Sequence, residues 1–194
     1  RRQAVQQRVD EARAALQTVE SDVRGAFMSE GPFDTGFIGT NGGSDKAPLD
    51  GLEVVAVNDQ ITREAWEIPT SSSRQDRKPP RIDVSRVQYW IEEDTSKAAQ
   101  GLVRERSKVL NPPGVSVRRD EDVEEIARNI TGLDVRYYDG QWKQEWDSRK
   151  VYKLPLAVEV TVWVRGEGRQ EVGLEPFTTR FYLQVGAEQP ERTP

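Results

Sequence analysis

The chain opens with RRQAVQQRVDEARAALQTVESDVRGAF, residues 1–27, and this stretch determines the predicted fold. Its apolar residues recur at alternating steps of four and three, the spacing of one stripe along a helix: Val5, Val9, Ala12, Leu16, Val19, Val23 and Ala26. Glycine and proline are absent before Gly25, and the intervening Gln, Arg and Ala are good helix formers. The pattern predicts one helix from Arg1 to Phe27.

The predicted apolar stripe is narrow and contains few large side chains. Such a helix packs along another part of the protein rather than forming a core of its own. We expect that part to bury Leu16, Val19 and Val23 and to leave the end from Val5 to Val9 exposed. A coiled-coil dimer is the alternative, although the stripe spans barely three heptads.

After the helix, the chain alternates between apolar and polar residues with a period of two, which is typical of strands. The expected strands are Leu52–Asn58, Glu64–Ile68, Ile82–Ile91, Leu102–Leu110, Leu133–Tyr137, Leu156–Val164 and Phe177–Val185. The third and fourth should form a hairpin, as should the last two, and Asp139-Gly140 is a two-residue hairpin turn. A phase shift near Ser85-Arg86 predicts a β-bulge.

Three stretches lack this alternation. Met28 to Gly51 is Gly-rich and aperiodic and predicts a long loop, and Thr70 to Arg81 has the composition of a mobile linker. Asp122 to Asn129 predicts one or two helical turns. The predicted fold is therefore α+β, with the helix of residues 1–27 and a β-rich head of residues 28–194, containing about eight antiparallel strands, in a single domain.

Composition narrows the classes of function. The net charge is -5, so nucleic acid is not expected as a partner, because phosphate binding requires a surplus of clustered Lys and Arg. The mean hydropathy of -0.76 predicts one modest core with solvated loops. Apolar runs fall short of the roughly 20 residues that cross a bilayer. Because Arg1-Arg2 already lies inside the helical pattern, we expect an upstream segment to have been removed.

The chain contains neither His nor Cys, which excludes Ser-His-Asp triads, Cys-His pairs and His-ligated metal sites. Carboxylate chemistry remains, from acidic clusters at Glu92-Glu93-Asp94 and Asp120 to Glu125, and calcium could use the same oxygens. Both clusters lie in predicted turns or at a helix start, where acids serve solubility. We expect no catalytic residue, metal or cofactor, and no pairing of Glu92, Asp94, Asp120 or Asp122 across a deep cleft.

Aromatic residues gather around the Asp139-Gly140 turn and in the strand that follows it: Tyr137, Tyr138, Trp142, Trp146 and Trp163. They could form a stacking platform for a carbohydrate or peptide. Cross-strand packing beside a hairpin turn is the simpler interpretation, and an exposed member would serve as an interface anchor.

Four segments, in this order, resemble the J-type minor pseudopilins of bacterial type II secretion systems. The first is Val19-Glu20-Ser21-Asp22-Val23-Arg24 at the end of the helix, and the second is the hairpin of Val87 to Ile91 with Gly101-Leu102-Val103-Arg104-Glu105. The third runs from Leu133 to Trp146 and contains YYDG, and the fourth is Leu154 to Val160. The resemblance is collinear and covers most of the chain outside the two loops.

This resemblance implies a pilin-like fold and a non-catalytic subunit of the pseudopilus tip that acts in assembly and protein export. Its partners would be the K-type and I-type minor pseudopilins and the major pseudopilin. The full-length protein would be anchored in the inner membrane, with this part in the periplasm. The contacts expected for partner binding are Val5, Val9, Ala12 and Leu16. A type IV minor pilin and a free-standing extracytoplasmic binding module with a Trp-rich hairpin are the alternatives.

Overall fold

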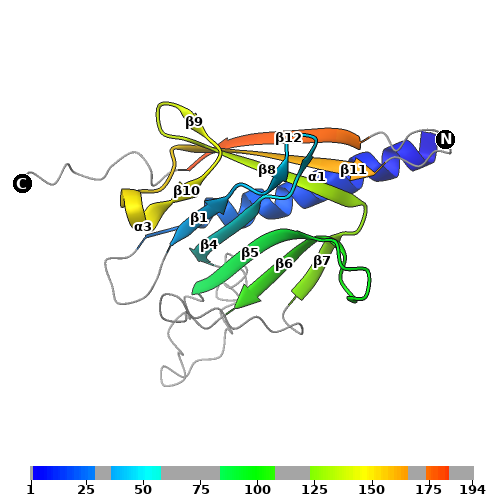
Figure 1. Cartoon of the computed structure of the whole chain (residues 1–194), viewed down its shortest axis with the longest axis horizontal. Helices are drawn as coiled ribbons and strands as arrows, with labels where there is room; N and C mark the ends of the chain where they lie inside the picture. The colour runs from blue at the N-terminus through cyan, green and yellow to red at the C-terminus, as the bar shows by residue number, and fades with distance from the viewer. Residues whose placement is uncertain (1, 29–35, 58–83, 108–122, 166–173, 184–194) are drawn as a thin grey trace, which may run out of the picture.

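The computed structural model describes residues 2–28, 36–57, 84–107, 123–165 and 174–183. These residues form a long N-terminal helix, α1 (Arg2–Arg24), and two antiparallel sheets, which confirms the α+β class. In Figure 1, α1 lies along the long axis of the molecule, and its contacts reach strands of both sheets. Within the described residues, no helix is long and apolar enough to span a membrane.

The helix ends three residues earlier than predicted, because the chain turns at Gly25. Its N–H donates to the Asp22 carbonyl, and Ala26 then forms an antiparallel bridge with Ala56. A Cβ atom at Gly25 would lie 2.8 Å from the carbonyl oxygen of Val57. Only glycine allows the chain to pass this close to the neighbouring strand, so the helix ends here.

The larger sheet has the strand order β10-β1-β4-β5-β6-β7. Its strands are β1 (Phe37–Thr40), β4 (Gly51–Val57), β5 (Val84–Glu92), β6 (Gly101–Ser107), β7 (Val123–Ala127) and β10 (Trp146–Asp147). The predicted hairpin of β5 and β6 is confirmed, with Tyr89 opposite Arg104. One face of this sheet packs toward α1.

The smaller sheet has the order β12-β11-β8-β9. Its strands are β8 (Ile130–Tyr138), β9 (Trp142–Lys143), β11 (Ala157–Arg165) and β12 (Leu174–Tyr182). The predicted pairing of the last two strands is confirmed, because β12 runs antiparallel to β11. The predicted hairpin at Asp139-Gly140 is also present, but its turn has three residues rather than two, since Tyr138 pairs with Trp142. A two-stranded ribbon of β2 (Gly43–Ser44) and β3 (Ala47–Pro48) and a short helix α3 (Ser148–Val151) complete the described elements.

The chain between β3 and β4 joins the two sheets. Leu49 forms a parallel bridge with Leu133, and the N–H of Asp50 donates to the carbonyl of Leu133 at 3.0 Å. The Asp50 carboxylate accepts from the N–H of Val135 at 2.8 Å and from that of Gly42 at 3.0 Å. The buried Asp50 side chain therefore accepts the hydrogen bond of a β8 backbone N–H at a position where no described strand pairs with that edge of β8.

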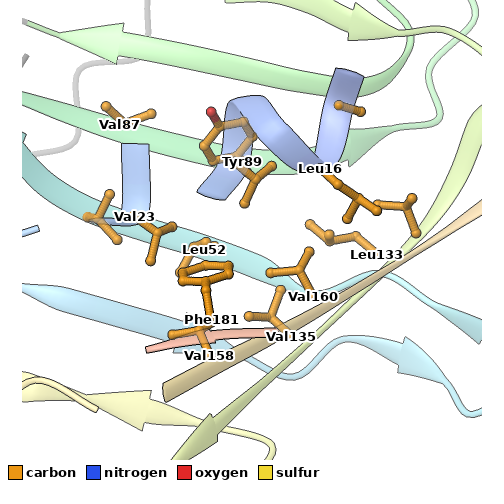
Figure 2. Close-up of a cluster of buried hydrophobic side chains, with 14 of the residues drawn as sticks. Leu16, Val23, Leu52, Val87, Tyr89, Leu133, Val135, Val158, Val160 and Phe181 are labelled. Carbon is orange, nitrogen blue, oxygen red and sulfur yellow. The ribbon is translucent and has the colours of Figure 1, made fainter. Parts of the chain in front are cut away.

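The core lies where α1 meets both sheets. Figure 2 shows side chains from the helix and from strands of the two sheets converging on one cluster, with Leu16 and Val23 contributed by α1. The largest fully buried side chains include Tyr89, Tyr137, Phe37 and Phe181. The expected burial of Leu16, Val19 and Val23 is confirmed, and Val5 is 46% exposed as expected. Val9, which was also expected to be exposed, is half-buried.

Three local predictions are wrong. The stretch from Met28 to Gly51 is not one loop, because it contains β1 and the β2–β3 ribbon. Asp122 to Asn129 contains the strand β7 instead of helical turns, because β6 offers an edge with which it pairs. The alternation in β5 continues without a bulge at Ser85-Arg86, because the buried polar Ser85 occupies the core-facing position in register with Ala56.

Several predicted features lie outside the described residues. These are the strand Glu64–Ile68, the linker Thr70–Arg81, and the acids Asp120 and Asp122.

Candidate functional site

Helix α1 has two halves in different surroundings. Ala12, Ala15, Leu16, Val19 and Val23 in its second half are buried beneath the head. The first turns extend beyond the sheets in Figure 1. The Glu11 carboxylate accepts from the backbone N–H and the side-chain amide of Asn129, at 3.2 and 2.9 Å, and so marks where the head begins to cover the helix.

The four residues predicted to contact partners fall on both sides of this boundary. Val5 is exposed and Val9 is half-buried. Ala12 is fully buried and Leu16 is 8% exposed, and both belong to the core that α1 forms with the head. The surface that this stripe leaves open to another protein therefore contains Val5 and Val9.

The second half of α1 is joined to the larger sheet by a polar cluster that the sequence patterns did not predict. The Asp22 carboxylate accepts from the Tyr89 hydroxyl at 2.5 Å, from Nη1 of Arg104 at 3.1 Å and from Nη2 of Arg106 at 2.8 Å. We call Asp22, Tyr89, Arg104 and Arg106 the Asp22 cluster. Its charged side chains are largely buried, with between 12% and 24% of their surface exposed.

Burial and the neighbouring charges determine the protonation states in this cluster. Burial, together with the adjacent Asp22 carboxylate, raises the pKa of Tyr89 well above its ordinary value, so the phenol remains a donor. Burial alone would lower the pKa of Arg104, but Glu124, Tyr89 and Asp22 raise it overall. The cluster therefore joins α1 to β5 and β6 through hydrogen bonds in which Tyr89 and Arg104 stay donors.

A groove of about 710 Å³ lies beside the Asp22 cluster, between the exposed side of α1 and the strands β4 and β6. Gln17, Ser21 and Arg24 form the helix side, and Arg104 and Arg106 form the sheet side. Each arginine already has an acidic partner, because Arg24 pairs with Glu20, Arg104 with Glu124 and Asp22, and Arg106 with Asp22. The groove is polar and nearly neutral in charge.

The sequence analysis also missed a pair of neighbouring acids, Asp50 and Asp134. Burial raises the pKa of Asp50, and the nearby Asp134 carboxyl adds to this effect despite the two backbone N–H donors. Burial likewise raises the pKa of Asp134. Asp50 is 1% exposed, and its hydrogen bonds hold backbone segments together, so this pair has a structural role at the junction of the sheets.

The described acids of the two clusters that the sequence suggested have structural partners. Glu124 and Glu125 lie in the strand β7, not in a turn or at a helix start as predicted, and pair with Arg104 and Arg128. Glu92 accepts from the N–H of Asp94, and Asp94 accepts from the N–H and hydroxyl of Ser96. These hydrogen bonds lower the pKa of Asp94. Among the described residues, no group of three or more acids is placed to hold a metal ion.

The aromatic side chains pack against the protein itself. Tyr137 meets Phe37 edge to face at 5.8 Å and Trp146 at 6.3 Å, and both Tyr137 and Trp146 are buried. Trp142 lies 5.2 Å from Tyr138, with the guanidinium group of Arg180 4.8 Å from its ring centre. The expected cross-strand packing is confirmed for Tyr138 and Trp142.

In the part of the chain that the structure describes, a β-rich head covers the second half of a long N-terminal helix, whose first turns extend beyond the sheets. The family model described as type II secretion system (T2SS), protein J, matches residues 1–172, and the chain belongs to this family. Its members are minor pseudopilins that act in protein transport by type II secretion. Comparisons with curated proteins and with solved structures gave no significant match.

The Asp22 cluster gives a physical reason for the sequence motifs that resembled this family. Asp22 lies in the motif at the end of α1, Tyr89 lies in the β5 motif and Arg104 lies in the β6 motif. These motifs are 67 and 82 residues from Asp22 in sequence, yet the three side chains are hydrogen-bonded to one another. The cluster joins the helix to the head through residues of three of these motif stretches.

Proposed function

We propose that the chain is a non-catalytic, pilin-like subunit of the pseudopilus tip that binds other pseudopilins through the first half of α1. The K-type and I-type minor pseudopilins would be its partners at the tip, with the major pseudopilin below them. An apolar segment N-terminal to residue 1 would anchor the subunit in the inner membrane, with the head in the periplasm.

The observation that supports this proposal is the change in surroundings along the apolar stripe. The same stripe that is buried from Ala12 to Val23 continues to Val9, which is half-buried, and to Val5, which is exposed. An apolar stripe on a projecting helix is suited to side-by-side packing with another helix, because both helices then remove apolar surface from water.

The experiment mixes this chain with the soluble domains of the K-type and I-type subunits of the same secretion system. Val5→Glu combined with Val9→Glu places two charges in the proposed contact. We expect binding, measured by titration calorimetry, to weaken about tenfold or more because each charge would have to be buried without a partner.

A matched control adds the same two charges away from the apolar stripe. Gln3→Glu with Gln7→Glu changes exposed positions that lie on the opposite side of the helix from Val5 and Val9. This control should bind like the unmodified chain. Equal binding by both double variants would contradict the proposed contact.

A further inference from the structure

The segment Arg149-Lys150-Val151-Tyr152-Lys153, hereafter the 149–153 segment, is exposed at every residue. It contains most of α3, which lies at the opposite end of the molecule from the N-terminus of α1 (Figure 1). The Tyr152 residue is 75% exposed and Val151 is 41% exposed. A tyrosine and a valine thus face solvent together, among three cations.

The backbone of Tyr152 is unusual for its residue type. It has φ 54° and ψ 32°, the left-handed conformation, and is the only non-glycine residue with positive φ in the described part of the chain. Its N–H ends α3 by donating to the carbonyl of Ser148 at 2.7 Å. Glycine or asparagine would adopt this conformation at lower cost. Because the ring is mostly outside the core, the fold itself gives little reason for a tyrosine here.

The 149–153 segment is held firmly on both sides. Before it, Ser148 is fully buried and its hydroxyl accepts from the N–H of Phe37 at 2.7 Å. The buried Trp146 donates from Nε1 to the carbonyl of Lys153 at 3.2 Å, and Leu154 is buried directly after the segment. The tyrosine is therefore presented on a fixed support, which reduces the entropy lost when a partner binds.

The charges around Tyr152 are arranged with the cations outermost. Arg149 and Lys150 share Asp147, and Lys143 and Lys153 share Asp139. The two carboxylates are 17% and 13% exposed, whereas Lys150 is 81% exposed. Counting the exposed Glu145 as well, four cations face three acids in a chain whose net charge is -5. Among the described residues, the 149–153 segment and its charged neighbours thus present one more positive than negative charge to an approaching surface.

We propose that Tyr152 and Val151, with the cations around them, form a docking surface for a second protein of the secretion machinery. The partner would supply an apolar pocket for the Tyr152 ring and carboxylates around it. Tyrosine and arginine are enriched among the residues that dominate binding energy, and a polar rim around an apolar centre is the usual arrangement. The inference rests on the proposed function, because a helix anchored at its N-terminus directs the 149–153 segment away from the membrane.

The test uses the full-length protein in the bacterium, with export of a type II substrate to the medium as the measurement. Tyr152→Gly removes the ring and relieves the backbone, so the melting temperature should be unchanged or higher, while export should fall about tenfold. Lys150→Glu should also reduce export. Lys46→Glu, the same charge change at an exposed turn between β2 and β3, and Leu174→Thr, at a partly exposed apolar position that starts β12, should export normally.

Normal export by both Tyr152→Gly and Lys150→Glu would overturn the docking surface. If Val5→Glu with Val9→Glu abolishes export while these variants do not, the proposed function remains and only this inference fails. If all of them export normally, both fail. Vesicles of phosphatidylglycerol test a lipid partner: binding of the isolated chain that Tyr152→Gly abolishes would replace the protein partner with a membrane surface, and no binding is expected.

Discussion

Asp22 shows how much one carboxylate can connect in this protein. Its two oxygens accept three hydrogen bonds, from a phenol on β5 and from two guanidinium groups on β6. The side chain is 12% exposed, so water can replace few of these bonds. Removing the Asp22 carboxylate alone would leave its buried donors without an acceptor. The stability lost in this way exceeds the net contribution of the intact ion pair.

We therefore predict that Asp22→Ala lowers the free energy of unfolding by about 3 kcal/mol. Urea denaturation measures this change directly. Glu20→Ala, which removes the exposed ion pair with Arg24 two residues earlier on the same helix, should cost less than about 1 kcal/mol. Similar losses for the two variants would mean that the Asp22 cluster is no more than a surface ion pair.

Asp50 and Asp134 give the stability a dependence on pH. Burial raises the pKa of both carboxyls above the ordinary value of 3.8, and each is close to the other. Other charges that act on them are Asp45, Arg136 and Glu159, and the buried Tyr137 faces both. The folded state therefore binds more protons than the unfolded chain just above pH 3.8, and stability from this pair falls as pH rises through the folded pKa values.

Replacing Asp134 with Asn should remove the part of this pH dependence that comes from the Asp134 carboxyl and from its charge beside Asp50. We expect Asp134→Asn to have a higher urea midpoint than the unmodified chain at pH 7, with the difference shrinking as pH falls toward 4. Asp94→Asn should behave in the opposite way, because the pKa of Asp94 is lowered by Ser96 and its charge stabilises the fold at neutral pH. If the difference in urea midpoint between Asp134→Asn and the unmodified chain does not change with pH, the raised pKa of Asp134 is contradicted.

At the scale of elements, α1 depends on packing more than on its own helical tendency. Its buried residues are small or branched, and Leu16 is the largest aliphatic side chain that it adds to the core. Leu16→Ala should lower the free energy of unfolding by about 2–4 kcal/mol, through lost burial and the cavity left behind. Val5→Ala, on the same stripe but outside the head, should change it by less than about 0.5 kcal/mol. Equal effects in thermal unfolding would show that the first turns of α1 are packed in solution.

The elements that the sequence predicts best are those whose pattern is local and long. The stripe of α1 and the alternation in β5, β6, β8, β11 and β12 follow from one buried face, and Asp139-Gly140 identifies its own turn. The helix end at Gly25 was missed because it depends on the position of Val57, 32 residues away.

The errors arise where a neighbour decides the structure. The strand β1 has four residues, two of them buried, and exists because β4 and β10 pair with it on either side. The strand β7 has a Glu-rich sequence that favours helix, yet Glu124 pairs with Arg104 across from it on β6. Ser85 looks like a break in the alternation because a polar residue occupies a core-facing position.

The candidate site was predictable only in part. Val5 and Val9 belong to an apolar stripe that the sequence shows directly, and their contact with a partner stays a prediction. The Asp22 cluster could not be derived from spacing, because its members are far apart in the chain and carry ordinary charges. Its signal lay in the family motifs, which contained Asp22, Tyr89 and Arg104 without showing that they touch.

At the scale of the whole molecule, the two ends have different surfaces. One end carries the uncovered turns of α1 with two valines, and the other carries α3 with its exposed cations (Figure 1). Together they suit a subunit that has neighbours at both ends rather than one that pairs with itself. A symmetric dimer brings the same patch of both copies together. Each end of the molecule would then contact an identical surface with the same charge and shape.

The last prediction is that the isolated chain is monomeric at micromolar concentration. Val5 and Val9 are already partly covered, so four such valines in a dimer would gain about 3–6 kcal/mol from burial. Association costs about 4–15 kcal/mol in lost rotational and translational freedom, and a dissociation constant of 1 μM requires a net gain of about 8 kcal/mol. Sedimentation velocity should therefore give one species of about 22 kDa.

Val5→Glu with Val9→Glu should keep the same melting temperature, because these positions add little to the fold. A tight homodimer, or a head that unfolds in the double variant, would show that α1 pairs with a second copy and would favour the coiled-coil alternative.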